Sequence, residues 1–181
     1  MLEDSLELCT EMQDFLEYEE DIRNELFSSD PLSAGMQIKI RIMESDEVLI
    51  KGLNYIVQKQ LWDEQIDQHG QKLPTYSPST IQKKKKIAGM PSDKLVNYTE
   101  YWSGRFYNEG IRIEADGASN EWRFVNTYAR PYFKYIDAVD IFGLTDENYA
   151  LFTAEVNQMI EDAFYDYYTE KMRERGYDMF Y

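Results

Sequence analysis

Apolar positions recur every three or four residues in three long segments of the chain, and this spacing predicts amphipathic helices. The segments cover residues 2–28, 45–68 and 145–175. Pro31 ends the first helix, because proline disfavours the helical conformation in the residue before it. Thr145 is placed to cap the last helix. The apolar stripes are Leu8, Met12, Phe15, Ile22 and Leu26, then Leu49, Leu53, Ile56, Val57 and Leu61, and finally Tyr149, Phe152, Val156, Met159, Ile160, Ala163 and Tyr167.

Three shorter segments alternate between apolar and polar residues, which predicts half-buried strands. They are residues 36–42, 111–115 and 121–126. The last two flank a polar turn at 116–120, so they predict a β-hairpin with a five-residue connection. We therefore expect an α+β fold, in which a small antiparallel sheet of these three strands is covered on one face by the long helices.

Turn and capping residues complete this division of the chain. Ser77-Pro78 predicts a short helix to about residue 87, with serine as the cap and proline in the first turn. Further short helices are expected at 98–107 and 131–139. The chain then divides into an acidic helical arm (1–30), an α+β core (31–144) and a C-terminal helix with an aromatic tail (145–181). The arm is compatible with docking on a neighbour or with packing on its own domain.

Charge is distributed unevenly along the chain. The formal net charge is −15, which argues against a general nucleic-acid binder. Residues 1–30 hold eleven acids and one arginine, and residues 145–181 hold nine acids and three bases. Residues 31–144 are close to neutral, with fourteen acids and fifteen bases. The acidic ends could pair with basic neighbours in an assembly, or they could be solvated helix faces.

Composition narrows the classes of protein further. The 15 tyrosines among 181 residues suit surfaces that bury against a partner, although they could also cover the domain's own core. Cys9 is the one cysteine, so an intrachain disulfide is impossible and a buried apolar role is expected. No apolar run reaches the length of a membrane span, and the acidic N-terminus is unlike a signal peptide. We expect a chain made in a reducing cytoplasm.

Residues with catalytic chemistry are scarce. His69 is the one histidine and stands in a glycine-containing turn. The sequence therefore offers few residues for a Ser-His-Asp site and too few histidines for a histidine-rich zinc site. The glycines never fall in a phosphate-binding spacing. Asp137 and Asp140 are three residues apart and could share a cation, or they could form a surface pair. We expect a protein that is not an enzyme and that uses no cofactor.

Residues 61–106 contain the most informative pattern. An acidic turn with Gly70 leads to Thr75-Tyr76-Ser77-Pro78, then to four lysines at 83–86, and then to an aromatic cluster. This order resembles the tail-completion and virion-morphogenesis proteins of tailed bacteriophages, with their pattern G-x-x-W/L-x-P-L-S-x-x-T. A second family pattern, L-x-x-T-G, has Tyr98-Thr99 in place of its Thr-Gly pair. The matching residues are Gly70, Leu73, Tyr76, Ser77, Pro78, Thr80, Lys83, Leu95 and Tyr101.

The resemblance implies a structural virion protein at the head–tail neck or the tail terminus, made in the host bacterial cytoplasm. Its expected partners are copies of itself in a ring, portal or neck proteins, tail-tube proteins and passing DNA. Two other functions stay open, a small DNA-contacting or magnesium-nuclease-like accessory protein and a non-viral helical adaptor. The candidate interface residues are Lys83, Lys84, Lys85, Lys86, Tyr101, Trp102, Tyr177, Met179, Phe180 and Tyr181.

Overall fold

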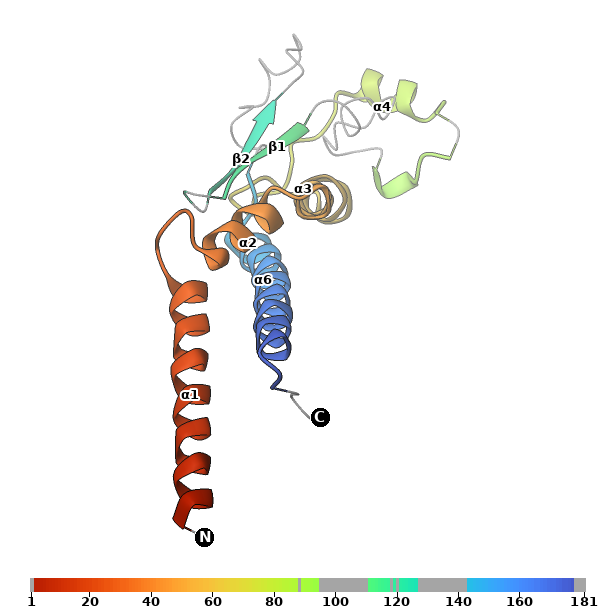
Figure 1. The fold of residues 1–181 in the computed structure, drawn as a ribbon. Coiled ribbons are helices and arrows are strands. Elements are labelled where there is room, and N and C mark those ends of the chain that lie inside the picture. Colours follow the sequence, from red (N-terminus) through yellow and green to blue (C-terminus); the bar gives the residue numbers. More distant parts are fainter. Residues whose placement is uncertain are drawn as a thin grey trace.

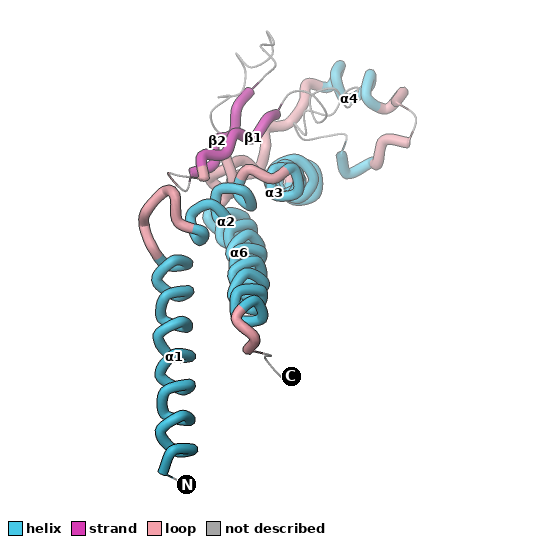
Figure 2. Tube along the Cα trace, in the orientation of Figure 1, coloured by secondary structure: helices cyan, strands magenta, loops and turns pink. Residues whose placement is uncertain are grey.

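The computed structural model describes residues 2–87, 89–94, 111–117, 119, 121–126 and 143–177, and the side chains from residue 10 onward. Its elements join a mainly helical body to one β-hairpin, which confirms the α+β class (Figures 1 and 2). The helices are α1 (Leu2–Phe27), α2 (Ala34–Met43), α3 (Asp46–Leu53), the π-helix η1 (Asn54–Glu64), α4 (Pro78–Lys84), the 3₁₀ turn η2 (Ser92–Lys94) and α6 (Asp146–Glu174). The strands are β1 (Ile111–Asp116) and β2 (Glu121–Asn126).

The two long helices α1 and α6 run antiparallel and extend in the same direction from the hairpin (Figure 1). The rings of Phe27 and Phe164 lie 6.0 Å apart at one end of the contact. Near the other end, the Tyr18 hydroxyl donates a hydrogen bond to the carbonyl of Lys171 at 3.0 Å. Buried Ile22 lies between these points in one apolar cluster with Leu26, Ile38 and Met172. The amphipathic patterns at both ends of the chain therefore bury against each other.

The strand expected at residues 36–42 is wrong, because this segment forms helix α2. Ser33 caps it, and its side-chain oxygen accepts a hydrogen bond from the Met36 amide. The isoleucines also satisfy a helical period, since Ile38 and Ile42, four residues apart, pack in the same apolar cluster. At Gly35, an added Cβ would lie 1.8 Å from the Leu26 carbonyl oxygen. That close approach lets α2 pack directly against the end of α1.

The helix expected at residues 45–68 is present in part. Ser45 caps α3 as expected, and its side chain accepts a hydrogen bond from the Val48 amide. At Asn54 the helix changes to a π-helix, whose hydrogen bonds reach back five residues. It ends at Gln65, which has a left-handed conformation with φ 55°. The wider turn shifts which side chains share a face after residue 54.

The predicted hairpin is confirmed. Strands β1 and β2 pair antiparallel with Ile113 opposite Phe124, and their connection is one residue shorter than expected. Ile111 and Ile113 are buried, whereas Arg112 and Glu114 are exposed, so one face of the hairpin packs on the body. The Trp122 ring also packs against Phe152 of α6 at 5.1 Å. The two strands are thus anchored to the helical layer.

A buried polar network joins η1 to the start of α6. Gln60 is fully buried. Its amide group donates to the carbonyl of Gly143 at 2.8 Å, and its side-chain oxygen accepts from the Thr145 amide at 2.9 Å. The Asn148 side chain donates to that same oxygen at 3.4 Å and to the Glu64 carboxylate at 3.0 Å. These bonds set where α6 begins relative to η1.

Candidate functional site

The lysine run is divided by the fold. Ser77 caps α4, because its side-chain oxygen accepts a hydrogen bond from the Thr80 amide, and Pro78 stands in the first turn. Lys83, Lys85 and Lys86 are exposed. Lys84 is fully buried, so the expected surface patch of four adjacent lysines is wrong. Three lysines of the run remain as candidates for contact with a partner.

Lys84 lies among aromatic and carbonyl groups. Its ammonium is 4.0 Å from the centre of the Tyr76 ring and donates a hydrogen bond to the Lys94 carbonyl at 3.3 Å. The Lys94 side chain is also buried, donates to the Trp62 carbonyl and pairs with Asp93 at 3.3 Å. These contacts compensate the loss of water around each ammonium. Both lysines hold the α4 segment on the end of η1.

Several residues of the phage-like pattern have folding roles. Gly70 has φ 74°, a backbone conformation that glycine adopts without strain. Leu73 is buried in an apolar cluster with Ile56, Leu61 and Ile111. His69 is an exposed residue of the turn, as expected, and its amide donates to the Asp67 side chain. The residues of the pattern between Gly70 and Lys83 therefore belong to a loop and helix that pack on the rest of the chain.

One residue of the expected aromatic tail lies in the described part of the chain. The Tyr177 ring is 5.0 Å from that of Phe15 in an edge-on arrangement, and 6.5 Å from that of Tyr18. This residue therefore contacts α1 of its own chain. The other tail candidates and two expected sites lie outside the described residues. These are Met179, Phe180 and Tyr181, the Tyr101 and Trp102 cluster with its expected helix at 98–107, and the Asp137 and Asp140 pair with its expected helix at 131–139.

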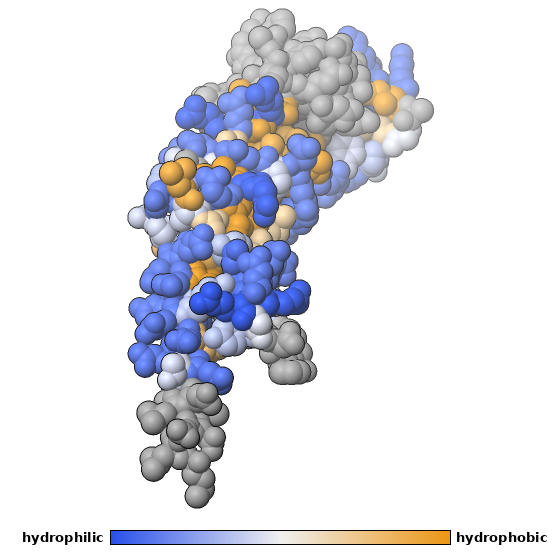
Figure 3. All heavy atoms as spheres, in the orientation of Figure 1, coloured by the Kyte–Doolittle hydropathy of each residue, from blue (hydrophilic) through white to orange (hydrophobic). Residues whose placement is uncertain are grey.

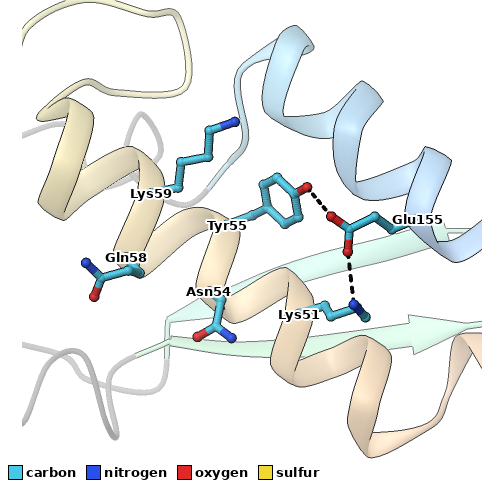
Figure 4. A pocket seen from close by; sticks show the side chains of 6 residues that line it. All are labelled: Lys51, Asn54, Tyr55, Gln58, Lys59 and Glu155. Atoms are coloured by element: carbon cyan, nitrogen blue, oxygen red, sulfur yellow. Dashed lines mark hydrogen bonds and ion pairs between the residues drawn. The ribbon is translucent and has the colours of Figure 1, made fainter.

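The structure brings together a groove, lined by polar and charged side chains, that the sequence analysis did not identify. It has a volume of about 370 Å³ and lies along α3 and η1 beside α6. Figure 4 shows Lys51 and Tyr55 pointing toward Glu155, whereas Asn54 and Gln58 point away from it. The groove is lined by Lys51, Asn54, Tyr55, Gln58, Lys59 and Glu155.

Among the described residues, Glu155 is the one acid that lines this groove, and two donors hold it. The Tyr55 hydroxyl donates to one carboxylate oxygen at 2.6 Å, and Lys51 donates to the other at 3.0 Å. These hydrogen bonds lower the pKa of Glu155, so the carboxylate stays ionised. The hydrogen bond to Glu155, with burial and the nearby negative charge, raises the pKa of Tyr55 to about 12.

Lys59 gives the groove its excess positive charge. Its ammonium lies 5.4 Å from the centre of the Tyr55 ring. Among the residues that the structure describes, no carboxylate lies within ion-pair distance of it. With the Lys51 charge balanced by Glu155, the groove can bind a negatively charged group. Lys51, Tyr55 and Lys59 recur every four residues, but nothing in that spacing indicates Glu155, which is about a hundred residues away.

A second exposed surface lies on the outer side of α1. The exposed fractions of Met12 and Leu16 are 62% and 54%, so no other part of the described chain covers these apolar side chains. Glu20, four residues after Leu16, is exposed beside them, and Glu17 is exposed farther round the helix, where Gln13 donates to it. On the face drawn in Figure 3, the surface along α1 is mostly hydrophilic, and hydrophobic residues gather nearer the middle of the molecule.

The described residues contain no cluster of three or more histidine, cysteine, aspartate or glutamate side chains able to hold a metal ion. Within the same residues, no helix has the length and apolar character needed to cross a membrane. Comparison of the chain with protein-family models, with curated proteins and with solved structures finds no match.

Proposed function

We propose that this protein is a structural component of a tailed-phage virion, at the head–tail neck or the tail terminus. It acts through contacts with copies of itself and with unlike neighbours, and not through turnover of a substrate. It is made in the host bacterial cytoplasm and enters the particle during assembly. The partners we propose are portal or neck proteins and tail-tube proteins.

The outer surface of α1 carries the proposal. This 26-residue helix packs along one side only, where Ile22 and Leu26 are buried. On its other sides it exposes Met12 and Leu16, and at its end Phe27 is 76% exposed although one edge of its ring lies against Phe164 of α6. Large apolar side chains on an otherwise acidic helix are typical of a surface that binds another protein. The helix therefore has the composition expected of an assembly arm.

The resemblance over residues 61–106 is the reason for proposing that the assembly is a phage virion. In the described part of this segment, Ser77 and Pro78 start a helix and Leu73 is buried. These roles belong to a folded docking element, with Lys83, Lys85 and Lys86 at its surface. The support for a virion protein is this ordered set of residues, and the support for protein contacts is the surface of α1.

The experiment is a search for the protein in purified particles of the phage that encodes it. We expect mass spectrometry to detect the chain in these particles. Its copy number should be far lower than that of the major capsid protein. Interruption of its gene should leave full heads and free tails that do not join, visible by electron microscopy. Particles that lack the chain and assemble normally without it would contradict the proposal.

A DNA-contacting role is the second candidate, because the three exposed lysines of the run lie together on α4 and the turn after it. Replacement of Lys83, Lys85 and Lys86 by serine separates the two functions. If the lysines contact acidic neighbours in the virion, the triple-serine variant should fail to assemble. The unmodified chain should then show no DNA binding. A mobility shift with short duplex DNA that disappears in the variant would favour the DNA-contacting role.

A further inference from the structure

The groove beside Glu155 and the outer face of α1 are complementary in charge and polarity. We infer that the groove formed by Lys51, Tyr55 and Lys59 binds the acidic α1 of a second copy of this chain. This inference rests on the proposed function and names one contact through which copies would associate. Four observations support it, from charge, apolar surface, position in the fold and chemistry of the lining residues.

Charge selects the acidic helix as the occupant. The net charge of residues 1–30 is ten units negative, from eleven acids and one arginine. Within α1, Arg23 already pairs with Glu19 at 2.6 Å. Glu17 and Glu20 are exposed, and no ion pair involves them among the described residues. The groove offers the Lys59 ammonium, whose charge also lacks a carboxylate within ion-pair distance in the part of the chain described.

Exposed apolar residues border both charged surfaces. Ile50, 57% exposed, lies four residues before Asn54 of the groove, and Leu151, 43% exposed, lies four residues before Glu155. Residues four apart on a helix are neighbours on its surface. On α1, Met12, Leu16 and Glu20 follow the same spacing. A contact between the two faces would therefore bury apolar side chains beside each ion pair, as stable interfaces do.

The position of the groove excludes α1 of the same chain. The observed contacts of α1 with α6 involve the C-terminal half of α6, from Phe164 to Lys171, and Tyr177 just after it. Glu155 belongs to the N-terminal half of α6. An intramolecular contact would thus require α1 to leave its apolar cluster. A contact between two copies uses two different surfaces, so it is heterologous and joins subunits head to tail.

The lining of the groove suits carboxylates on a helix. Asn54 and Gln58 point away from Glu155 in Figure 4. The Gln58 amide donates to the Asp63 carboxylate at 3.2 Å, which leaves the Asn54 amide beside the Lys59 ammonium in the lining. Amide and ammonium groups donate hydrogen bonds to carboxylates. Because Tyr55 and Lys51 are held by Glu155, the groove keeps its shape without an occupant. A helix can therefore dock on a preformed surface whose Lys59 ammonium and Asn54 amide face its carboxylates, which reduces the entropy lost on binding.

Sedimentation equilibrium of the full chain tests this contact with single charge reversals. The unmodified chain should associate with rising concentration, and added salt should weaken the association. Lys59→Glu and Glu20→Lys should each lower the association constant about tenfold, because each places like charges across the contact. An equimolar mixture of these two variants should recover association, because each supplies the surface that the other lacks.

The matched control is Lys72→Glu, which makes the same charge change at an exposed lysine outside the groove and should leave association unchanged. Melting temperatures verify that each variant is folded, and Leu16→Ser provides a second disruption that changes no charge. Association that Lys59→Glu and Glu20→Lys leave unaltered would overturn the inference. The inference would also be wrong if the unmodified chain stayed monomeric at all concentrations. It would be wrong too if the chain bound a short DNA duplex and Lys59→Glu abolished that binding. The search for the chain in purified particles tests the proposed function separately, since a virion protein can associate through another surface.

Discussion

At the scale of single residues, Lys84 shows that one lysine in a charged run can be a buried structural residue while its neighbours are exposed. Its neighbours Lys83 and Lys85 are exposed, but Lys84 is buried beneath Tyr76 and bonded to the Lys94 carbonyl. Replacement by alanine removes the packing of a long side chain and leaves that carbonyl without its donor. We expect Lys84→Ala to lower the free energy of unfolding by about 2–3 kcal/mol, measured by urea denaturation.

The neighbouring lysine provides the control for this prediction. Lys83 belongs to the same run and to the same helix, but its side chain is exposed. Lys83→Ala should change the free energy of unfolding by less than about 0.5 kcal/mol. Equal effects of the two substitutions would show that Lys84 is not a structural residue.

Tyr55 gives a prediction about pH. Its hydrogen bond to Glu155, followed by burial and the charge of that carboxylate, raises the Tyr55 pKa from 10.0 to about 12. Because the folded state holds the proton more tightly than the unfolded state, this contribution to stability is complete below pH 10 and is lost as pH rises toward 12. NMR of ring-labelled tyrosine, assigned with Tyr55→Phe, measures this titration. In Glu155→Gln, the Tyr55 pKa should fall toward 10, and an unchanged value would contradict the proposed cause.

At the scale of elements, the contact between η1 and α6 depends on one buried side chain. Gln60 donates to the Gly143 carbonyl and accepts from the Thr145 amide and the Asn148 side chain. Gln60→Ala would remove the side-chain partner of the Gly143 carbonyl and of the Thr145 amide and would create a cavity, whereas Asn148 would keep its hydrogen bond to Glu64. We expect a loss of about 2–4 kcal/mol in the free energy of unfolding, measured by chemical denaturation.

A glutamine two residues earlier tests whether the effect is specific. Gln58 is exposed and bonds to Asp63 at the surface. Gln58→Ala should therefore cost less than about 0.5 kcal/mol. If both alanine variants were equally stable, the polar network would not hold α6 on η1.

Elements with a strong local pattern were predictable from the sequence, whereas ambiguous ones were not. The hairpin has both alternation and a turn, and both terminal helices have long apolar stripes, so local and tertiary preferences agree. Residues 36–42 satisfy two periods at once. The capping bond of Ser33 and packing against α1 and α6 favour the helix. The change to a π-helix at Asn54 has no sequence signal of its own.

The candidate site was less accessible to prediction than the fold. The capping role of Ser77 follows from local chemistry, but the burial of Lys84 depends on contacts with Tyr76 and Lys94. The groove depends on the packing of α6 beside α3 and η1. That packing brings Glu155 to Lys51 and Tyr55, although about a hundred residues separate them in sequence.

At the scale of the whole molecule, the beginning of α1 and the end of α6 lie toward the same end of the body (Figure 1). The chain thus concentrates its two acidic segments in one antiparallel helix pair, and the described elements α3, η1, β1 and β2 of the near-neutral segment lie toward the other end. Apolar contacts hold the pair together against the repulsion between the two acidic segments. Tyr177 closes this pair, because its ring packs against Phe15 and its amide donates to the Met172 carbonyl.

The last prediction concerns this closing contact. Tyr177→Ala removes the ring that covers Phe15 and Tyr18, so α1 should separate more readily from α6. We expect a loss of about 1–3 kcal/mol in the free energy of unfolding, since the ring is half-buried, and faster proteolysis within α1. Deletion of residues 178–181 keeps Tyr177 and provides the comparison. If Met179, Phe180 and Tyr181 bind a partner, this deletion should impair particle assembly and leave the monomer as stable as before. A stable Tyr177→Ala monomer would contradict the role of Tyr177, and a destabilised deletion variant would assign the aromatic tail to the protein's own core.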